Sequence, residues 1–356
     1  MVILHISYIV GSKYQGVDVV VPEHIKHQAE YASVGFINVN NVRIDGIVNQ
    51  FDFTSPFNLD ALPVPFNRPD LVVFHEAYRV EYLKISKILR KNKIPYIIIP
   101  HGELTNEAQK KKWLKKKVAN LLLFNRFIGG AAAIQCLSER ELNSTRFGKM
   151  KFVGTNGIDM PKKQKQSFND GGIKFTYIGR LDSYIKGLDL LINAVAVNKR
   201  LMIENNCTLT LYGPDRFGRG DRIRGLISEN GVSEIVTLKS EVSGETKESV
   251  LIASDVFVQT SRSEGMPMGI LEALSYGLPV LITEGTTLGG YVKEYNAGWV
   301  AETSVDSIGR MFEHVVGERA LLDKKSYNAV NLVKNNFEWS KIATGIVEKY
   351  CNIIKK

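Results

Sequence analysis

The chain has 356 residues, of which 44% are hydrophobic and 23% are charged, a globular composition long enough for two domains. Its net charge of +9 favours attraction to anionic surfaces in general, but no recognisable nucleic-acid module accompanies it, so nucleic acid is not an expected partner. The three cysteines match no metal-binding spacing, and there is no basic leader or uninterrupted apolar span, so we expect a cytoplasmic protein without a metal site.

Short apolar runs alternate with longer amphipathic stretches along the whole chain. The first half contains VILHISY, GFINVNN, LVVFHE, PYIIIP and AAAIQC, and after Lys162 the pattern restarts with IKFTYIG, CTLTLYG, EIVTL, DVFVQT, LPVLIT and AGWV. Apolar runs of this length between helical stretches indicate buried parallel strands in βαβ units. The sequence therefore predicts an α/β fold with two doubly wound, Rossmann-like domains facing across a cleft.

The polar stretch 161–172, PKKQKQSFNDGG, has the composition of a linker. We therefore expect an N-terminal domain over 1–160 and a C-terminal domain over 161–339. In folds of this kind ligands bind at the carboxyl ends of the strands, so the loops that follow each strand are where functional side chains are expected.

Two loops of the N-terminal half place a histidine directly after a predicted strand. His101 follows PYIIIP, and His75 stands with Glu76 in FHEAY after the preceding strand. A lone histidine is more often a structural residue than a functional one. Position alone therefore leaves both readings open for His101.

The segment 110–124, KKKWLKKKVANLLLF, is the most basic part of the chain. Six lysines fall within eight positions and are followed by an apolar run. A basic amphipathic helix suits an anionic membrane surface, whereas a solvated basic face is the alternative. The candidate surface residues are Lys110, Lys111, Lys112, Trp113, Lys115, Lys116 and Lys117.

The loop after the strand IKFTYIG contains Arg180 and Lys186, just before the helical stretch GLDLLINAV. Two cations at the mouth of a helix suit a diphosphate. An ordinary solvated loop is the alternative. Known phosphate motifs are missing: GSKYQG lacks the ending of a P-loop, GRGDRIRG has the wrong spacing for a dinucleotide fingerprint, and no Asp-x-Asp or GxSxG occurs.

Two glutamates bracket the stretch EGMPMGILE, which follows the strand DVFVQT. Pro267 suits the first position of a helix, which places Glu264 in the loop and Glu272 about two turns inward. The backbone of Gly265, Met266, Pro267 and Met268 would mark the N-terminus of this helix, where free N–H groups bind anions. A carboxylate one or two turns into a helix can accept hydrogen bonds from ribose hydroxyls, as acidic side chains do in other nucleotide sites. The alternative interpretation of each glutamate taken alone is an acidic residue that stabilises the start of a helix and binds no ligand.

These motifs together resemble glycosyltransferase family 4, the retaining enzymes of the GT-B fold that use nucleotide-sugar donors. The resemblance covers nearly the whole chain. It rests on Glu264 and Glu272 ahead of EALSYGLPV, on GRLDSYIKGLDLLINAV, on TNGIDMP and on the C-terminal FEWSKIATGIVEKY. It implies that a helix over about 340–356 crosses back to complete the N-terminal domain.

The resemblance also implies residue roles. Arg180 and Lys186 would grip the donor diphosphate, Glu272 would hold the ribose, and Glu264 and His101 would lie beside the donor sugar. Gly16 corresponds to the family's Gly-rich first loop, although SKYQGV lacks the usual Gly-Gly pair, and Ser240 replaces a frequent glycine close to the expected nucleotide base.

The expected function is thus transfer of a sugar from a nucleotide-sugar, UDP before GDP, without a metal or other cofactor. The acceptor would be a glycan or lipid-linked glycan in bacterial surface polysaccharide or glycoconjugate synthesis, with docking of the N-terminal domain on the cytoplasmic face of the membrane. The alternatives are another GT-B enzyme, such as a nucleotide-sugar epimerase or a phosphorylase, and a non-catalytic two-lobed sugar-binding protein.

Overall fold

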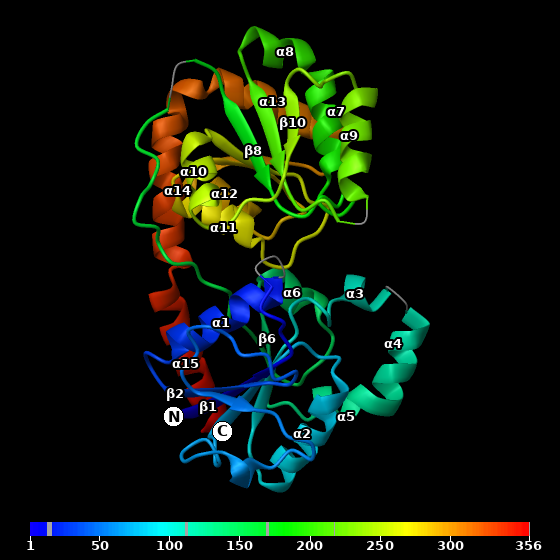
Figure 1. Ribbon diagram of the computed structural model, residues 1–356, viewed down its shortest axis with the longest axis vertical. Helices are drawn as coiled ribbons and strands as arrows, with labels where there is room; N and C mark the ends of the chain where they lie inside the picture. The colour runs from blue at the N-terminus through cyan, green and yellow to red at the C-terminus, as the bar shows by residue number, and fades with distance from the viewer. Residues whose placement is uncertain (13–15, 111–112, 169–170, 217, 356) are drawn as a thin grey trace. The chain divides into compact units, whose positions relative to one another are not determined.

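The computed structural model describes residues 1–12, 16–110, 113–168, 171–216 and 218–355. The chain divides into unit 1, Met1–Gly157 with Trp339–Lys356, and unit 2, Ile158–Glu338. The sequence places these boundaries at 160 and 339. Each unit contains one parallel sheet covered by helices, as Figure 1 shows, which confirms the predicted α/β class.

The sheet of unit 1 has seven parallel strands in the order β3-β2-β1-β4-β5-β6-β7. The apolar runs of the first half all form strands, and two short strands, β3 and β7, were not predicted. The strands are β1 (Val2–Ser7), β2 (Ser33–Asn38), β3 (Gln50–Asp52), β4 (Leu71–His75), β5 (Tyr96–Ile99), β6 (Ala133–Cys136) and β7 (Lys151–Val153). Strand order reverses between β1 and β4, so the carboxyl ends of these two strands form the switch point of the sheet.

Helices cover both faces of this sheet. One apolar cluster joins α2 and α5 to alternate residues such as Leu4, Val72 and Phe74. On the other face α1 packs against α15. Because α15 is the last helix of the chain and donates a hydrogen bond from Tyr350 to Gln135 of β6, the C-terminus completes the first unit as expected. The helices are α1 (Gly16–Gln28), α2 (Val80–Lys91), α3 (Asn106–Lys110), α4 (Trp113–Ala119), a π-helical turn (Asn120–Phe124), α5 (Asn125–Gly129), α6 (Glu139–Ser144) and α15 (Trp339–Ile354).

The sheet of unit 2 has six parallel strands in the order β10-β9-β8-β11-β12-β13. These are β8 (Lys174–Ile178), β9 (Thr208–Tyr212), β10 (Val236–Lys239), β11 (Val256–Gln259), β12 (Val280–Thr283) and β13 (Gly298–Ala301). Neighbouring residues of β11 enter opposite clusters, since Val256 and Val258 join one and Phe257 joins the other. This burial on both faces explains why the strand reads as a continuous apolar run.

In Figure 1, α7 and α9 lie on one side of this sheet and α10, α11, α12 and α14 on the other. The helices are α7 (Leu188–Val197), α8 (Lys199–Glu204), α9 (Arg219–Glu229), α10 (Gly244–Ala253), α11 (Met268–Ser275), α12 (Gly289–Tyr295), α13 (Val305–Gly317) and α14 (Leu322–Asn336). The switch point lies between β8 and β11. The two loops singled out in the sequence, after IKFTYIG and after DVFVQT, therefore follow the two strands at this switch point.

The expected linker 161–172 is not a free connector where the structure describes it. Lys165 donates its amide to the carbonyl of Tyr276, and its ammonium pairs with Asp255 at 3.1 Å with both side chains nearly buried. The polar composition therefore reflects a strap that is tied to α10 and α11 of unit 2, and the linker interpretation was wrong here.

Candidate functional site

Glu264 forms an ion pair with Lys186, which joins the two loops at the switch point of unit 2. The Lys186 Nζ to Glu264 Oε1 distance is 2.5 Å, and each side chain is only 13% exposed. Gln259 and Ser261 donate to the same oxygen at 3.1 and 2.7 Å. Two residues that the sequence assigned separately to diphosphate and sugar therefore lie in one charged cluster.

The position of Lys186 follows from the backbone of Gly187, which caps α7 in the left-handed region at φ 64°. A Cβ at this residue would lie 1.9 Å from the carbonyl oxygen of Thr260, and the Thr260 hydroxyl donates to the carbonyl of Gly187. Only glycine allows this approach. The β8 loop is thereby fixed against the end of β11, which brings Lys186 to Glu264.

A second clamp holds the same two loops together. The guanidinium of Arg262 binds both carboxylate oxygens of Asp189, at 2.7 and 2.8 Å, and its amide donates to the carbonyl of Ile185. Hydrogen bonding to Asp189 raises the pKa of Arg262, so this bidentate pair stays charged. The loops therefore form a preorganised surface beside the Lys186–Glu264 pair.

Glu272 lies four positions after the first residue of α11, about one turn into the helix. The helix begins at Met268 with Pro267 as its N-cap, so Pro267 does not occupy the first helical position and Glu272 lies one turn closer to the mouth than expected. Its carboxylate pairs with the ammonium of Lys247 on α10. Lys247 was not singled out in the sequence, because its helix is far from the glutamates along the chain.

The expected run of free amides at the start of α11 is wrong at Pro267, which has no N–H, and at Met268. The amide of Met268 donates to the carbonyl of Met266 at 3.1 Å, which tightens the turn into the helix. Gly265 has open space around its α-carbon, so its backbone is accessible to a ligand.

Arg180 occupies an exposed position directly after β8. Its carbonyl accepts a hydrogen bond of 2.7 Å from the hydroxyl of the buried Tyr177. Burial, with a smaller contribution from Glu264, raises the pKa of Tyr177 well above its ordinary value, so the phenol stays protonated and acts as this donor. Among the described residues Arg180 forms no ion pair, which leaves its charge available to an anion.

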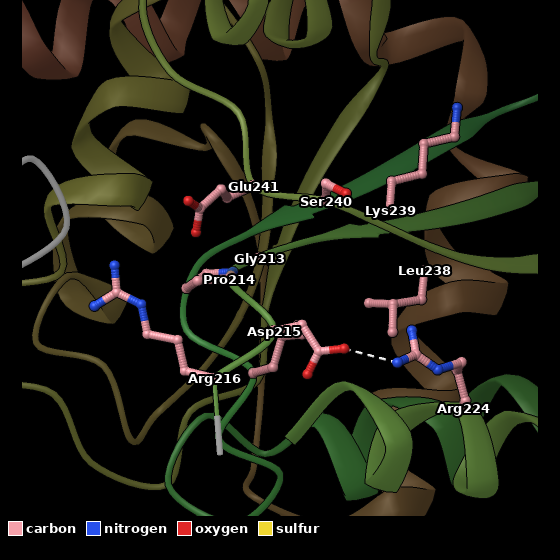
Figure 2. A pocket seen from close by; sticks show the side chains of 10 residues that line it. Gly213, Pro214, Asp215, Arg216, Arg224, Leu238, Lys239, Ser240 and Glu241 are labelled. Atoms are coloured by element: carbon pink, nitrogen blue, oxygen red, sulfur yellow. Dashed lines mark hydrogen bonds and ion pairs between the residues drawn. The ribbon is translucent and has the colours of Figure 1, made fainter. Parts of the chain in front are cut away.

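A pocket of about 640 Å³ lies beyond the carboxyl ends of β8, β9 and β10. Figure 2 shows its lining side chains and the ion pair of 2.7 Å between Asp215 and Arg224. It is lined by Leu181, Gly213, Pro214, Asp215, Arg216, Arg224, Leu238, Lys239, Ser240 and Glu241. Gly220 of GRGDRIRG packs against this turn, since a Cβ there would meet the Asp215 carboxylate at 2.3 Å.

Sequence reasoning anticipated Ser240 here and missed the charged lining residues. The sequence could have indicated Asp215, Arg216, Lys239 and Glu241, because they follow the runs CTLTLYG and EIVTL. These two runs form neighbouring strands of the sheet. The pocket also adjoins the start of α10, the helix that supplies Lys247 to Glu272.

In unit 1, His101 lies in the turn after β5 with a left-handed backbone, φ 48°. The turn is held by Glu141, which accepts the amides of Gly102 and Leu137 at 2.6 and 2.7 Å. His101 is hydrogen-bonded to His75 at 3.1 Å, and His75 to His5 at 2.9 Å. Burial lowers the pKa of His101 to about 3, so its ring is neutral.

The first loop and the lysine segment are the remaining candidate sites of unit 1. Gly16 begins α1 and has no atom of the described chain within 4 Å of an added Cβ. Lys111 and Lys112 lie outside the described residues. From Trp113 to Phe124 the expected helix is present as α4 followed by a π-helical turn, and the partly buried Lys116 donates to the carbonyl of Ala108.

The exposed face of α4 and the π-helical turn is apolar as well as basic. Half or more of each side chain is exposed at Trp113 (58%), Leu114 (59%), Val118 (50%), Leu121 (72%), Leu122 (72%) and Leu123 (51%). Lys110, Lys115 and Lys117 are also exposed. Among the described residues, no helix combines the length and the hydropathy that crossing a bilayer requires.

Comparison with known proteins relates both the sequence and the fold to other chains. Residues 159–331 match the family model described as glycosyl transferases group 1. An uncharacterized glycosyltransferase of Methanocaldococcus jannaschii is 28% identical over 175 residues, which are 49% of this chain and 43% of that protein. The UDP-Gal:alpha-D-GlcNAc-diphosphoundecaprenol alpha-1,3-galactosyltransferase of Escherichia coli is 34% identical over 106 residues, 30% of this chain and 27% of that protein. The chain thus spans less than half the length of these curated relatives.

Solved structures match over almost the entire chain. Sucrose-phosphate synthase from Thermosynechococcus elongatus aligns with a TM-score of 0.76 at 16% identity over 99% of both chains. HepE of Anabaena in complex with UDP and glucose aligns with a TM-score of 0.72 at 16% identity over 99% of this chain and 100% of that chain. At such identities the likeness shows the fold, which is GT-B. Residues 159–331, nearly all of unit 2, belong to the glycosyl transferases group 1 family.

Proposed function

We propose that this protein is a retaining glycosyltransferase that moves a sugar from a nucleotide-sugar to a glycan or lipid-linked glycan in bacterial surface polysaccharide or glycoconjugate synthesis. The observation that carries the proposal is the nearly buried Lys186–Glu264 pair at the switch point of unit 2, in the segment that matches the family model. UDP is the preferred nucleotide, with GDP next. The Escherichia coli relative, whose name specifies UDP-Gal, and the HepE complex with UDP and glucose support this choice.

The donor would lie along the carboxyl edge of the unit 2 sheet. The pocket after β9 and β10 has the volume of a small-ligand site and would take the base, with Ser240 in its lining. Glu272, next to Lys247, would accept hydrogen bonds from the ribose hydroxyls. Arg180 and Lys186 would then face the diphosphate, as family resemblance also implies.

The chemistry would depend on stabilising the leaving diphosphate. Charge grows on the phosphate oxygens as the glycosidic bond breaks, and Arg180, Lys186 and the backbone near Gly265 would stabilise it. The acceptor hydroxyl would attack from the face that the leaving group vacates and pass its proton to a phosphate oxygen. Glu264 and His101 would position the sugar, a role that rests on the family resemblance. No metal is assigned to this reaction.

A donor panel tests the proposal. UDP-, GDP-, ADP- and CMP-sugars are screened by thermal shift, where a donor at one hundred times its Kd adds about 2.7 kcal/mol of stability. Nucleotide release is then measured with and without acceptors, in EDTA. We expect stabilisation by a UDP- or GDP-sugar and acceptor-dependent release that survives EDTA. Donor isomerisation without an acceptor would indicate an epimerase, and binding without turnover a sugar-binding protein. Activity restored only by Mn²⁺ would overturn the metal-free site.

We further propose that α4 and the π-helical turn dock unit 1 on an anionic membrane surface, which would bring a lipid-linked acceptor to the enzyme. Leucines exposed by 51–72% stand beside exposed lysines, the combination that interfacial helices use. Each lysine near an anionic surface contributes about 1 kcal/mol.

Vesicle sedimentation with a matched control tests this docking. Replacing Lys110, Lys115 and Lys117 with Gln should release the protein from anionic vesicles at low salt. The control replaces Lys84, Lys87 and Lys91, which are exposed on α2 of the same unit, and removes the same charge. Equal release of both triple variants would show that binding depends on overall charge and not on this face. If the parent protein does not bind anionic vesicles, a water-soluble acceptor becomes the better interpretation.

A further inference from the structure

Three histidines of unit 1 are hydrogen-bonded in series. His5 Nδ1 lies 2.9 Å from His75 Nε2, and His75 Nδ1 lies 3.1 Å from His101 Nε2. The strand register explains the alignment: His5 pairs with Val73 of β4, so His75 stands two residues further along on the same face of the sheet. His75 in turn pairs with Ile99, two residues before His101. The series runs from the core to the partly exposed His101.

The inner end of the series is anchored by an amide. His5 Nε2 lies 3.1 Å from Gln28 Oε1, and Gln28 Nε2 lies 3.4 Å from His24 Nδ1. His24 Nε2 lies 2.9 Å from Asn156 Oδ1. With the amide in this orientation, Gln28 accepts from His5 and donates to His24.

For this orientation of the Gln28 amide, proton counting along the series gives one set of tautomers. A neutral imidazole has one N–H donor and one acceptor nitrogen. His5 donates from Nε2 to Gln28, so its Nδ1 accepts from Nε2 of His75, whose Nδ1 accepts from Nε2 of His101. His101 is left with a bare Nδ1, and no described residue hydrogen-bonds to that atom. Turning the Gln28 amide reverses every bond and places the proton on Nδ1 of His101 instead.

The surroundings keep the rings neutral. Burial lowers the pKa of His5 to about 3, that of His24 to about 4 and that of His75 well below its ordinary value. The charged or titratable groups that act on His5, His75 and His101 are the neighbouring histidines, each of which disfavours a second cation. Around His24 the packed groups are His27 and, edge-on at 4.9 Å between ring centroids, Trp339.

We propose that His5, His75 and Gln28 are positioning residues that hold His101 as the Nε2–H tautomer, so that its bare Nδ1 accepts a hydrogen bond from a hydroxyl of a sugar substrate bound at this edge of the unit 1 sheet. The proposal deepens the proposed function and rests on it for the identity of the ligand. The backbone of His101 is left-handed, at φ 48°, a conformation that a residue with a side chain keeps where the surrounding structure holds it.

Nitrogen-15 NMR of the parent protein tests the tautomer without a variant or a substrate. Long-range correlations in protein labelled with ¹⁵N-histidine distinguish a bare ring nitrogen from a protonated one, and His101 is assigned from a His101→Gln sample. We expect a bare Nδ1 and a protonated Nε2 at pH 7.5, unchanged at pH 5.5. A protonated Nδ1, or a cationic ring at pH 5.5, would overturn the proposal.

A matched pair of variants at Gln28 tests the role of the inner anchor. Gln28→Glu keeps an oxygen that accepts from His5, so His101 should keep its tautomer and kcat/KM should stay within about twofold of the parent. Gln28→Leu removes the acceptor; His101 should show mixed tautomers and kcat/KM should fall about tenfold, the scale of one hydrogen bond. UDP affinity should be unchanged in both. Equal kcat/KM losses with an unchanged tautomer would mean a purely structural Gln28.

The two proposals fail separately. If no nucleotide-sugar is turned over but the tautomer is as stated, the histidine series stands and the proposed function is wrong. If turnover occurs while His101 carries its proton on Nδ1, the function stands and the series is only packing.

Discussion

The Lys186–Glu264 pair places opposite charges at 2.5 Å in a nearly buried position. Removing one partner of such a pair leaves the other charge desolvated and unpaired. In the proposed reaction Lys186 must also serve the donor diphosphate, so Glu264 competes with the phosphates for this ammonium. The charge of Glu264 would therefore reduce nucleotide affinity while its position serves the sugar.

Glu264→Gln should accordingly separate binding from turnover. We expect kcat to fall about a hundredfold, the scale of one preorganised electrostatic contact. UDP affinity should stay equal or rise, because Lys186 is released to the diphosphate. Calorimetric titration with UDP and steady-state kinetics check both parts. A parallel loss of affinity and kcat would contradict the competition between carboxylate and phosphate.

Glu272→Ala should instead act on nucleotide binding. The carboxylate pairs with Lys247 and is proposed to receive the ribose hydroxyls, so its loss should weaken UDP about tenfold. Lys247→Met is the control, since it removes the same ion pair but keeps the carboxylate. If Glu272→Ala binds UDP as the parent does, or if both variants weaken UDP equally, the ribose assignment is wrong. Titration of UDP by thermal shift measures the difference.

At the scale of elements, the geometry of the proposed donor site depends on how each loop enters its helix. Both Gly187 and Gly218 cap a helix in the left-handed region, at φ 64° and φ 68°. The space around them differs: a Cβ at Gly187 would lie 1.9 Å from the carbonyl oxygen of Thr260, whereas no described atom lies within 4 Å of a Cβ at Gly218. The first junction is therefore set by packing against β11, and the second by local backbone conformation alone.

Replacing each glycine with Ala separates the two causes. Gly218→Ala should cost about 1–2 kcal/mol, the penalty of a left-handed residue with a side chain. Gly187→Ala should cost more, about 3–5 kcal/mol, because the backbone must also move away from Thr260. Thermal unfolding of the two variants measures the gap. Equal destabilisation would show that the contact with Thr260 is relaxed without cost.

At the scale of the whole molecule, the histidines are unevenly divided. Five of the six, His5, His24, His27, His75 and His101, lie in unit 1, and His314 lies in unit 2. Burial lowers the pKa of three of them to about 3 or 4. The unfolded chain therefore binds more protons than the folded one between those values and about pH 6.5, so the free energy of unfolding falls as the pH decreases through this range.

Unit 1 should thus lose stability in acid before unit 2 does. Each neutral histidine contributes up to about 1.4 kcal/mol per pH unit below pH 6.5. Hydrogen exchange, corrected for intrinsic rates, should show that protection in β1 and β4 decreases between pH 7.5 and 5.5. The strand β9 of unit 2 serves as the internal control. Parallel loss in β1, β4 and β9 would place the acid sensitivity elsewhere.

Much of the fold followed from the sequence because buried parallel strands appear as uninterrupted apolar runs. Each of the eleven runs quoted from the sequence forms a strand, whereas β3 and β7, of three residues each, lack such a run and were missed. The loops after β8 and β11 were found for a related reason, since their Gly, Pro and charged residues follow those runs directly. The predicted start of α11 and the predicted linker at 161–172 were wrong. Residue composition does not show which residues pack against a domain, and this packing decides where an element or a domain begins.

The sequence by itself determined the fold class, the strand positions and the loops in which the proposed donor-binding residues lie, because these depend on local periodicity and on turn chemistry. Only the tertiary structure decided which side chains meet. Lys186 and Glu264 are 78 positions apart, Lys247 and Glu272 are 25 apart, and His5 and His75 are 70 apart. Such contacts depend on strand order and register, which bring the carboxyl ends of distant strands to one edge and align histidines of different strands on one face; no local pattern encodes either.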